Sequence, residues 1–344
     1  MDLVNQFVPR NNPAVSDAVR VSDLINSLND RLLFAVPKKG RLHQQCLDLL
    51  QGSDIQFHRH SRLDIALCLN LPMALVFLPA ADIPRFVGEG RVDLGITGRD
   101  MIAEAQVEVE ELLDLGFGKC KLQVQVPENG EYDSPEQLVG KNICTSFTGL
   151  AGEYFERLER DAGKKQEKSD TLQVGEIKGG ARSGSTMGRL ATKIKYVGGS
   201  VEASCALGVA DGIVDLVESG ETMKAAGLKA IATILETTAI LIKSTHPTNP
   251  ELIKTIESRI RGVITAKKYV LCTYNVPREK LAAATEITPG KRAPSVTTLD
   301  EEGWVAVSAM VEKKAIANAM DNLEKIGATD ILVMNIANSR TSRE

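Results

Sequence analysis

The sequence has few of the residue patterns that mark metal sites and disulfide scaffolds. It contains no CxxC pair, and only His58 and His60 of its four histidines lie close together. Because a structural zinc site normally takes four ligands, this pair does not by itself predict a metal centre. Six cysteines scattered along the chain favour reduced thiols, so we expect a cytoplasmic protein in which most cysteines are small core residues.

The chain also lacks an excess of positive charge and a long apolar run. Its 41 basic and 45 acidic residues give a formal net charge of −4, so no nucleic-acid partner is expected. The longest apolar run, at 71–81, is interrupted by Pro72 and Pro79 and is shorter than the roughly 20 residues of a membrane-spanning helix, so no membrane association is expected. The first residues show no signal-peptide pattern, and we interpret 1–29 as an N-terminal extension.

What is present is a chain of 344 residues, which is too long for one ordinary hydrophobic core and predicts two or three domains. Strand and helix patterns alternate from residue 32 to residue 243 and predict an α/β core. We expect a first lobe at 30–122 plus 229–246 and a second lobe at 123–228. A chain that leaves one lobe, builds another and returns makes a hinged cleft.

The segment 247–344 has a different order of elements. Asn249 followed by Pro250 predicts a helix start. The pattern after this helix is strand, helix, strand, strand, helix, strand, which is the ferredoxin-like split motif. The segment has no obvious nucleophile and base pair and no phosphate loop, so we predict a regulatory or assembly role for it.

The segment 164–192 is poor in large apolar residues and rich in glycine, serine, lysine and arginine. Such a composition does not bury enough surface to offset the entropy of ordering, which predicts a long loop. Two interpretations remain open: a basic flap over a phosphorylated ligand, and an insertion that takes no part in binding.

One stretch combines an apolar strand at 213–217, a small-residue turn at Ser219 and Gly220, and a helix start near Thr222. Free backbone amides and the helix dipole at such a start favour an anion without any basic side chain. Asp215 is the unusual residue, because a carboxylate within an apolar strand needs a hydroxyl, a metal or a cation to offset its desolvation. The stretch therefore predicts a phosphate site with an adjoining carboxylate.

Two further segments repeat this order of strand, turn and helix. Lys38, Gly40 and Arg41 follow an apolar run, and cations at a helix start complement phosphate, Arg41 with a bidentate fork. A solvated basic turn is the alternative. The third segment runs from Asp93, inside a strand pattern, through Gly98 to Asp100.

The most specific segment of the chain has Glu202, Gly208, Asp215-Leu216, Ser219-Gly220 and Thr222 at fixed spacing. Five further segments, which follow a fixed order along the chain, support it. The supporting segments are Pro37 to Leu42, Asp82 to Pro84, Val92 to Gly98, Thr145-Ser146 and Gly327 to Val333. Over almost all of 32–340 the chain thereby resembles the long form of the ATP phosphoribosyltransferase family.

This resemblance implies a two-lobed core like that of periplasmic binding proteins, followed by a ferredoxin-like regulatory domain that binds histidine. It implies transfer of the phosphoribosyl group from phosphoribosyl pyrophosphate to N1 of ATP, the first step of L-histidine biosynthesis, with feedback inhibition by histidine. Mg²⁺ is expected on the substrate phosphates rather than on a protein metal site. A homo-oligomer is also implied, a hexamer in exchange with dimers.

The resemblance also assigns residues. Catalytic roles are implied for Asp215 and Arg41. Contacts with phosphoribosyl pyrophosphate are implied for Glu202, Asp211, Asp215, Glu218, Ser219, Gly220, Glu221 and Thr222. Contacts with the nucleotide are implied for Lys38, Gly40, Arg41, Asp93, Gly98 and Asp100.

Three of these residues have structural alternatives. Asp93 could satisfy neighbouring backbone donors, Asp211 could cap a turn, and Glu202 could be a dipole partner at a helix start. Glu218 and Glu221 place negative charge beside a loop meant for phosphate, which backbone donors and a magnesium ion would have to offset.

The alternative function is a small-molecule sensor with the same fold and no turnover. A sensor of uncharged metabolites would not need a phosphate loop next to Asp215 or a basic turn at Lys38 and Arg41. A different phosphoribosyltransferase would usually carry paired acidic residues directly before the loop, where this chain has only Asp215.

Overall fold

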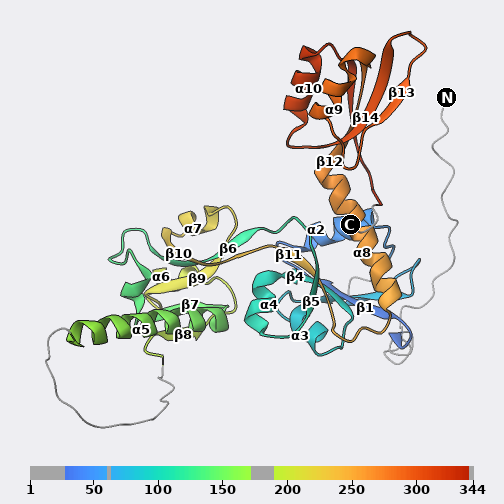
Figure 1. Cartoon of the computed structure of the whole chain (residues 1–344). Helices are drawn as coiled ribbons and strands as arrows, with labels where there is room; N and C mark the ends of the chain where they lie inside the picture. Colours follow the sequence, from blue (N-terminus) through green and yellow to red (C-terminus); the bar gives the residue numbers. More distant parts are fainter. Residues whose placement is uncertain (1–27, 60–62, 172–189, 341–344) are drawn as a thin grey trace.

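The computed structural model describes residues 28–59, 63–171 and 190–340, of which 164–171 are described by their backbone alone. These residues form two α/β lobes and a C-terminal α/β domain, each built on its own sheet (Figure 1). The predicted N-terminal extension lies almost entirely outside the described residues. No helix within the described ranges is long and apolar enough to cross a membrane.

The first lobe contains a six-stranded sheet with the strand order β2-β3-β1-β4-β11-β5. Its strands are β1 (Leu32–Pro37), β2 (Ile65–Leu67), β3 (Met73–Leu78), β4 (Leu94–Gly98), β5 (Glu110–Asp114) and β11 (Ala239–Lys243). Its helices are α2 (His43–Gly52), α3 (Ile83–Gly88) and α4 (Arg99–Ala105). Strand β1 pairs in parallel with β3 and β4, and its run of apolar residues is explained by burial on both faces.

The second lobe contains a five-stranded sheet with the order β10-β6-β9-β7-β8. Its strands are β6 (Cys120–Pro127), β7 (Asn142–Thr145), β8 (Lys193–Tyr196), β9 (Gly212–Val217) and β10 (Leu228–Thr237). Its helices are the 3₁₀ turn η1 (Pro135–Leu138), α5 (Thr148–Thr171), α6 (Ala203–Ala206) and α7 (Glu221–Ala225). Strand β10 pairs with β6 over its whole length, so it belongs to the second lobe and not to the first, where the boundary at 229 would place it.

Helix α5 corrects the start of the predicted loop at 164–192. The helix continues to Thr171, because lysine, glutamine and glutamate are good helix formers. At the other end, the Thr192 hydroxyl donates a hydrogen bond of 2.6 Å to Glu159 of α5, so this residue is docked rather than part of a loop. The rest of the predicted loop, at 172–189, lies outside the described residues.

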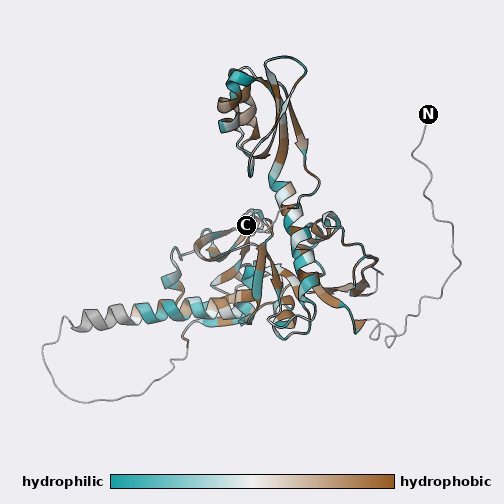
Figure 2. Cartoon of the chain, turned by 45° about the vertical axis from the view of Figure 1, so that its right-hand side comes forward, coloured by the Kyte–Doolittle hydropathy of each residue, from teal (hydrophilic) through white to brown (hydrophobic). Residues whose placement is uncertain are grey.

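The C-terminal domain contains a four-stranded antiparallel sheet with the order β13-β14-β12-β15. Its strands are β12 (Tyr269–Pro277), β13 (Ser295–Thr298), β14 (Trp304–Glu312) and β15 (Thr329–Asn335). Its helices are the 3₁₀ turn η2 (Arg278–Lys280), α9 (Leu281–Ile287) and α10 (Ile316–Lys325). This order confirms the predicted ferredoxin-like domain, whose strands carry much of its apolar sequence (Figure 2).

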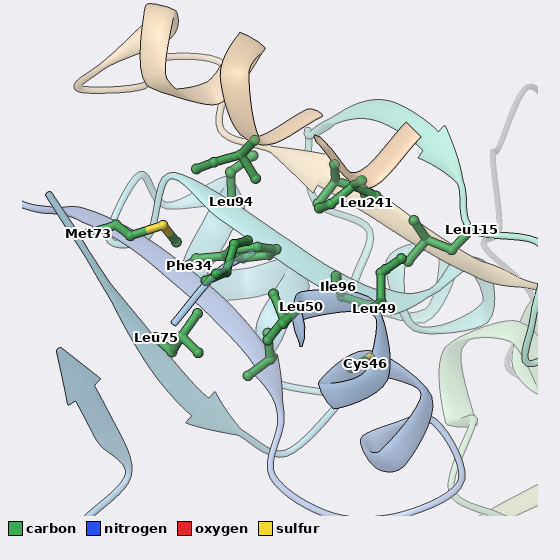
Figure 3. Packing of buried hydrophobic residues seen from close by; sticks show 14 of the residues in the cluster. Phe34, Cys46, Leu49, Leu50, Met73, Leu75, Leu94, Ile96, Leu115 and Leu241 are labelled. Atoms are coloured by element: carbon green, nitrogen blue, oxygen red, sulfur yellow. The ribbon is translucent and has the colours of Figure 1, made fainter. Parts of the chain in front are cut away.

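Helix α8 (Pro250–Lys268) joins this domain to the first lobe (Figure 1). It begins as predicted, since the Asn249 side chain accepts a hydrogen bond of 3.1 Å from the Leu252 amide. Its buried side chains, however, pack into the core of the first lobe, which also contains Phe34 and Leu241 (Figure 3). The C-terminal domain therefore starts with β12 and not at 247, and it stands on a helix that belongs to the first lobe.

The end of the described chain returns to the first lobe. The Asn338 side chain donates a hydrogen bond of 2.8 Å to the carbonyl of Gly52, the last residue of α2. All six cysteines are free, and all except Cys205 are buried, as expected of reduced core thiols.

Candidate functional site

Within the described part of the chain, three cavities lie where the two lobes meet. A cavity of about 250 Å³ is enclosed mainly by the second lobe, and one of about 170 Å³ mainly by the first. Arg41 and Leu216 line both of these cavities. A wider cavity of about 700 Å³ shares Cys120, Glu218 and Ser219 with the 250 Å³ cavity. The lobes thus enclose one continuous candidate site.

The loop after β9 forms one wall of the 250 Å³ cavity. Gly220 has φ of +81°, a left-handed conformation that glycine adopts without strain, and α7 begins directly after it. The Ser219 hydroxyl accepts a bond of 3.3 Å from the Glu221 amide. The Lys224 amide bonds to the Gly220 carbonyl at 3.0 Å, so the Thr222 amide precedes the first bonded turn of the helix. The predicted strand, turn and helix start are therefore confirmed.

Asp215 lies in the same cavity with Glu202 and Glu218. Its Oδ1 accepts a bond of 2.8 Å from the Leu216 amide. Burial raises the pKa of the Asp215 carboxyl above its usual 3.8, and the negative charge of Glu202 adds to this rise, while the Leu216 amide opposes it. Three carboxylates and the guanidinium of Arg41 therefore share one small space, which favours ligands rich in hydroxyl groups or bound cations.

Arg41 is the basic group of this space. It follows Gly40 at the turn between β1 and α2, and its side chain is 26% exposed. Its Nη1 donates a bond of 2.6 Å to the carbonyl of Gly118, in the segment that crosses from the first lobe to the second. Its Nη2 lies 3.9 Å from Oδ1 of Asp100. Arg41 is thus held by both a carbonyl and a carboxylate while it faces two cavities.

Asp100 is completely buried in the first turn of α4. Its Oδ1 accepts a bond of 2.7 Å from the Thr237 hydroxyl. Gly98 has ordinary extended dihedral angles, but a Cβ atom at this position would collide with the Asp100 carboxylate. Glycine is therefore required here by the carboxylate and not by the backbone conformation.

The structure does not bring every predicted residue to this place. Both oxygens of Asp93 accept hydrogen bonds, one from the Leu33 amide at 2.9 Å and one from the Thr248 amide at 2.7 Å, at the opposite end of β4 from Gly98. Asp211 likewise bonds to the Asn142 amide at 2.8 Å, before β9 begins. Both carboxylates therefore accept bonds from backbone amides, Asp211 from the start of β7 rather than within a turn.

Two other predicted residues lie at the margin. The Lys38 amine donates a bond of 2.7 Å to Asp64 and is absent from the lining of the described cavities, as is Glu221. Glu221 is an exposed first residue of α7. The charge of Glu221 thus lies beside the loop and not inside the cavity. Glu218 does line the cavity, so its negative charge must still be offset if phosphate binds there.

The sequence profile described as ATP phosphoribosyltransferase matches residues 79–262, and the profile described as HisG, C-terminal domain, matches residues 266–338. An ATP phosphoribosyltransferase of Yarrowia lipolytica is 63% identical over 318 residues, which cover 92% of this chain and 99% of the relative. The chain belongs to the ATP phosphoribosyltransferase family. The enzyme of Saccharomyces cerevisiae with the same name is 55% identical over 319 residues, with the same two coverages of 92% and 99%.

A solved structure supports the fold of the core. The ATP phosphoribosyl transferase (HisG:HisZ) complex from Thermotoga maritima includes a chain with a TM-score of 0.51 and 20% identity, covering 67% of this chain and 96% of that one. Because both profiles match within one chain here, the protein is of the long form. The two profiles meet at the end of α8, just before β12.

Several further residues line the cavities without having been predicted, among them Lys39, Cys120, Leu216 and Thr237. Lys39 stands in the basic turn and had the same signal as Lys38. Burial raises the pKa of the Cys120 thiol to about 11, so this thiol is protonated and neutral near pH 7. Thr237 gave no sequence signal, because its role depends on a contact with a residue 137 positions away.

Proposed function

We propose that this chain transfers the phosphoribosyl group from phosphoribosyl pyrophosphate to N1 of ATP, releasing pyrophosphate. The observation that carries the proposal is the position of Arg41, which faces the phosphate-loop cavity and the adjoining cavity of the first lobe at once. A transfer between two anionic substrates needs a cation at their boundary, where the phosphate that leaves and the nucleotide that attacks are both close.

The loop after β9 holds the ribose 5-phosphate in this proposal. Ser219, Gly220 and Thr222 offer hydroxyls and the amides of a helix start, which together accept an anion. Asp215 stands directly before the loop and accepts hydrogen bonds from ribose hydroxyls. Glu202 adds a second acceptor for the same sugar, which gives the acidic side of the cavity a use in binding a polyhydroxy ring.

The nucleotide occupies the first-lobe side. The cavity there is lined by Lys39, Gly40 and Arg41 at the turn before α2 and by Gly98 and Asp100 at the turn before α4. Lys39 and Arg41 face the ATP phosphates. Lys38 joins them only if it leaves Asp64, with which it forms an exposed ion pair that is worth at most about 1 kcal/mol.

The chemical step needs management of charge more than transfer of protons. The bond between N1 of adenine and the anomeric carbon forms while the bond to the pyrophosphate oxygen breaks, with inversion at carbon. Arg41 stabilises the departing pyrophosphate, and Asp215 lies on the side where the sugar ring becomes positive. Preorganised groups of this kind are worth about 3–4 kcal/mol each in the transition state.

Magnesium fits this donor set in a limited way. Within the described residues, no group of three or more histidine, cysteine, aspartate or glutamate side chains is arranged to hold a metal. Mg²⁺ commonly binds through one or two carboxylates plus substrate phosphates, and Asp215 and Glu218 are the carboxylates that would meet it here. Bound in that way, the ion would supply Lewis-acid stabilisation of the pyrophosphate and offset the charge of Glu218.

We also propose that histidine inhibits the enzyme through the C-terminal domain, and that the chain forms hexamers in exchange with dimers in the cytoplasm. The edge strand β15 supports the assembly, since Leu332 is 59% and Met334 is 47% exposed. Exposed apolar residues on an unpaired sheet edge favour association with another chain.

The test combines purified protein, ATP, phosphoribosyl pyrophosphate, magnesium and a pyrophosphatase, and follows the ultraviolet absorbance of N1-substituted adenine. Turnover that falls when histidine is added supports both parts of the proposal. Folded protein without turnover would support the sensor alternative, and turnover that histidine does not change would remove the regulatory part. Analytical ultracentrifugation of the same samples measures the assembly.

A further inference from the structure

Thr237 fixes the side chain and the backbone of Asp100 together. Its hydroxyl donates a bond of 2.7 Å to Oδ1 of Asp100 and accepts one of 3.0 Å from the Asp100 amide. Both residues are buried, Asp100 completely and Thr237 to 5% exposure. Thr237 ends β10, one residue before the chain re-enters the first lobe as β11, whereas Asp100 lies in the first lobe.

Arg41 lies near the same oxygen of this carboxylate. Its Nη2 is 3.9 Å from Oδ1 of Asp100, and its Nη1 bonds to Gly118 at 2.6 Å. Gly118 precedes β6 in the outgoing crossing segment, and Thr237 precedes β11 in the returning one. Both segments that join the lobes therefore contact the pair formed by Arg41 and Asp100.

The second oxygen of Asp100 adds no further anchor to the carboxylate. Oδ2 is buried and has no hydrogen-bond partner among the described residues. The Thr237 hydroxyl bonds to Oδ1, the same oxygen that lies 3.9 Å from Arg41, so this bond fixes the position of the negative charge nearest the guanidinium.

We propose that Thr237 is a positioning residue for the transfer reaction and acts on Arg41 through Asp100. The inference rests on the proposed role of Arg41 at the boundary of the two substrates. It gives a buried hydroxyl outside the phosphate loop an effect on the rate of transfer. It also makes the orientation of Arg41 depend on the crossing segments, and hence on how the lobes are placed.

Thr237→Val tests this, because valine keeps the shape of threonine and removes the hydroxyl. The value of kcat should fall about tenfold or more, the loss expected for one bond to a charged group, while KM for both substrates changes little. Thr237→Ser should restore most of the rate. Thr233→Val is the matched control, since Thr233 lies on the same strand and accepts an exposed bond of 3.0 Å from Gln123.

A double-mutant cycle separates positioning from a general loss of structure. In an Arg41→Ala background, Thr237→Val should cause no further fall in kcat. Full tenfold losses in both backgrounds, or a wild-type rate in Thr237→Val, would overturn the inference. An unchanged rate in Arg41→Ala alone would instead overturn the proposed role of Arg41. If Thr237→Val does not fold, Asp100→Asn takes its place in the cycle with the same expectation for kcat, whereas KM for ATP is not compared because Asp100 lines the nucleotide cavity.

Discussion

The carboxylate of Glu104 in the first lobe caps the amino-terminal end of α5 in the second lobe, at Gly149. Its Oε1 accepts a bond of 2.8 Å from the Gly149 amide, and its Oε2 accepts one of 2.9 Å from the next amide, that of Leu150. A carboxylate at this end of a long helix also meets the positive end of the helix dipole. The lobes are thus joined by a charged cap as well as by the two crossing segments.

Replacement of this cap should lower stability. We expect Glu104→Gln to reduce the free energy of unfolding by about 1 kcal/mol, because it removes the charge and one of the two acceptors. Urea titration measures this difference. The control is Glu156→Gln on α5, the capped helix, where the exposed pair of Glu156 with Arg160 is worth only about 0.5 kcal/mol. Equal losses in the two variants would contradict the capping role.

A substitution of Asp93 tests whether this residue stabilises the fold or binds the nucleotide. Asp93→Asn turns one of its two acceptor oxygens into a donor facing another donor, so the free energy of unfolding should fall by about 1–3 kcal/mol. KM for ATP should stay unchanged, because the residue lies at the far end of β4 from Gly98. Asp82→Asn serves as control, since Asp82 makes no side-chain cap bond at the start of α3. A raised KM for ATP in Asp93→Asn would return this residue to the nucleotide site.

Two glycines with positive φ flank α7, Gly220 in the loop before it and Gly227 after it. Gly220 and Gly227 have φ of +81° and +66°, so alanine at either position should cost about 1 kcal/mol of stability. Only Gly220→Ala should weaken phosphoribosyl pyrophosphate, by about tenfold in KM, because only Gly220 lines the cavity. Thr222→Ala should likewise affect phosphoribosyl pyrophosphate more than ATP. Equal effects of the two glycine variants on KM would show that the loop is misassigned.

The raised pKa of Asp215 predicts a dependence of stability on pH. Unfolding lets this carboxyl ionise at its ordinary pKa of 3.8, so its ionisation favours the unfolded chain and costs stability as the pH rises from 3.8 through the raised folded pKa. Asp215→Asn should therefore be more stable than wild type at pH 7 and less active. The gain in stability should shrink as the pH is lowered toward 3.8.

Glu159 supplies the opposite control for that experiment. Partial burial alone would raise the pKa of its carboxyl, but bonds from Thr192 and from the Ala191 amide lower it below 4.5. Glu159→Gln should therefore lose stability at pH 7, and this loss should fade as the pH falls through the lowered folded pKa. Urea titrations of both variants across pH check the two signs. Changes of the same sign would contradict the assigned environments.

Patterns that depend on neighbouring residues were readable from the sequence. The loop at Ser219 and Gly220 was predicted correctly because a strand end, a left-handed glycine and a helix start are set by a few adjacent residues. The ferredoxin-like order of the C-terminal domain was predictable for the same reason. Asp93 and Asp215 show the limit, since both occur as Val-Asp-Leu. Asp93 precedes β4, whereas Asp215 lies inside β9 near the end that meets the cavities.

The sequence by itself therefore determined the order of the elements, the strand, turn and helix start around Gly220, and the family. Only the tertiary structure decided that β10 belongs to the second lobe and that α8 completes the core of the first. An apolar face in the sequence does not specify which other element it packs against. It also decided which charged residues meet. Arg41, Asp100 and Thr237 are adjacent only because the two crossing segments bring distant strand ends together, and no local pattern encodes that distance.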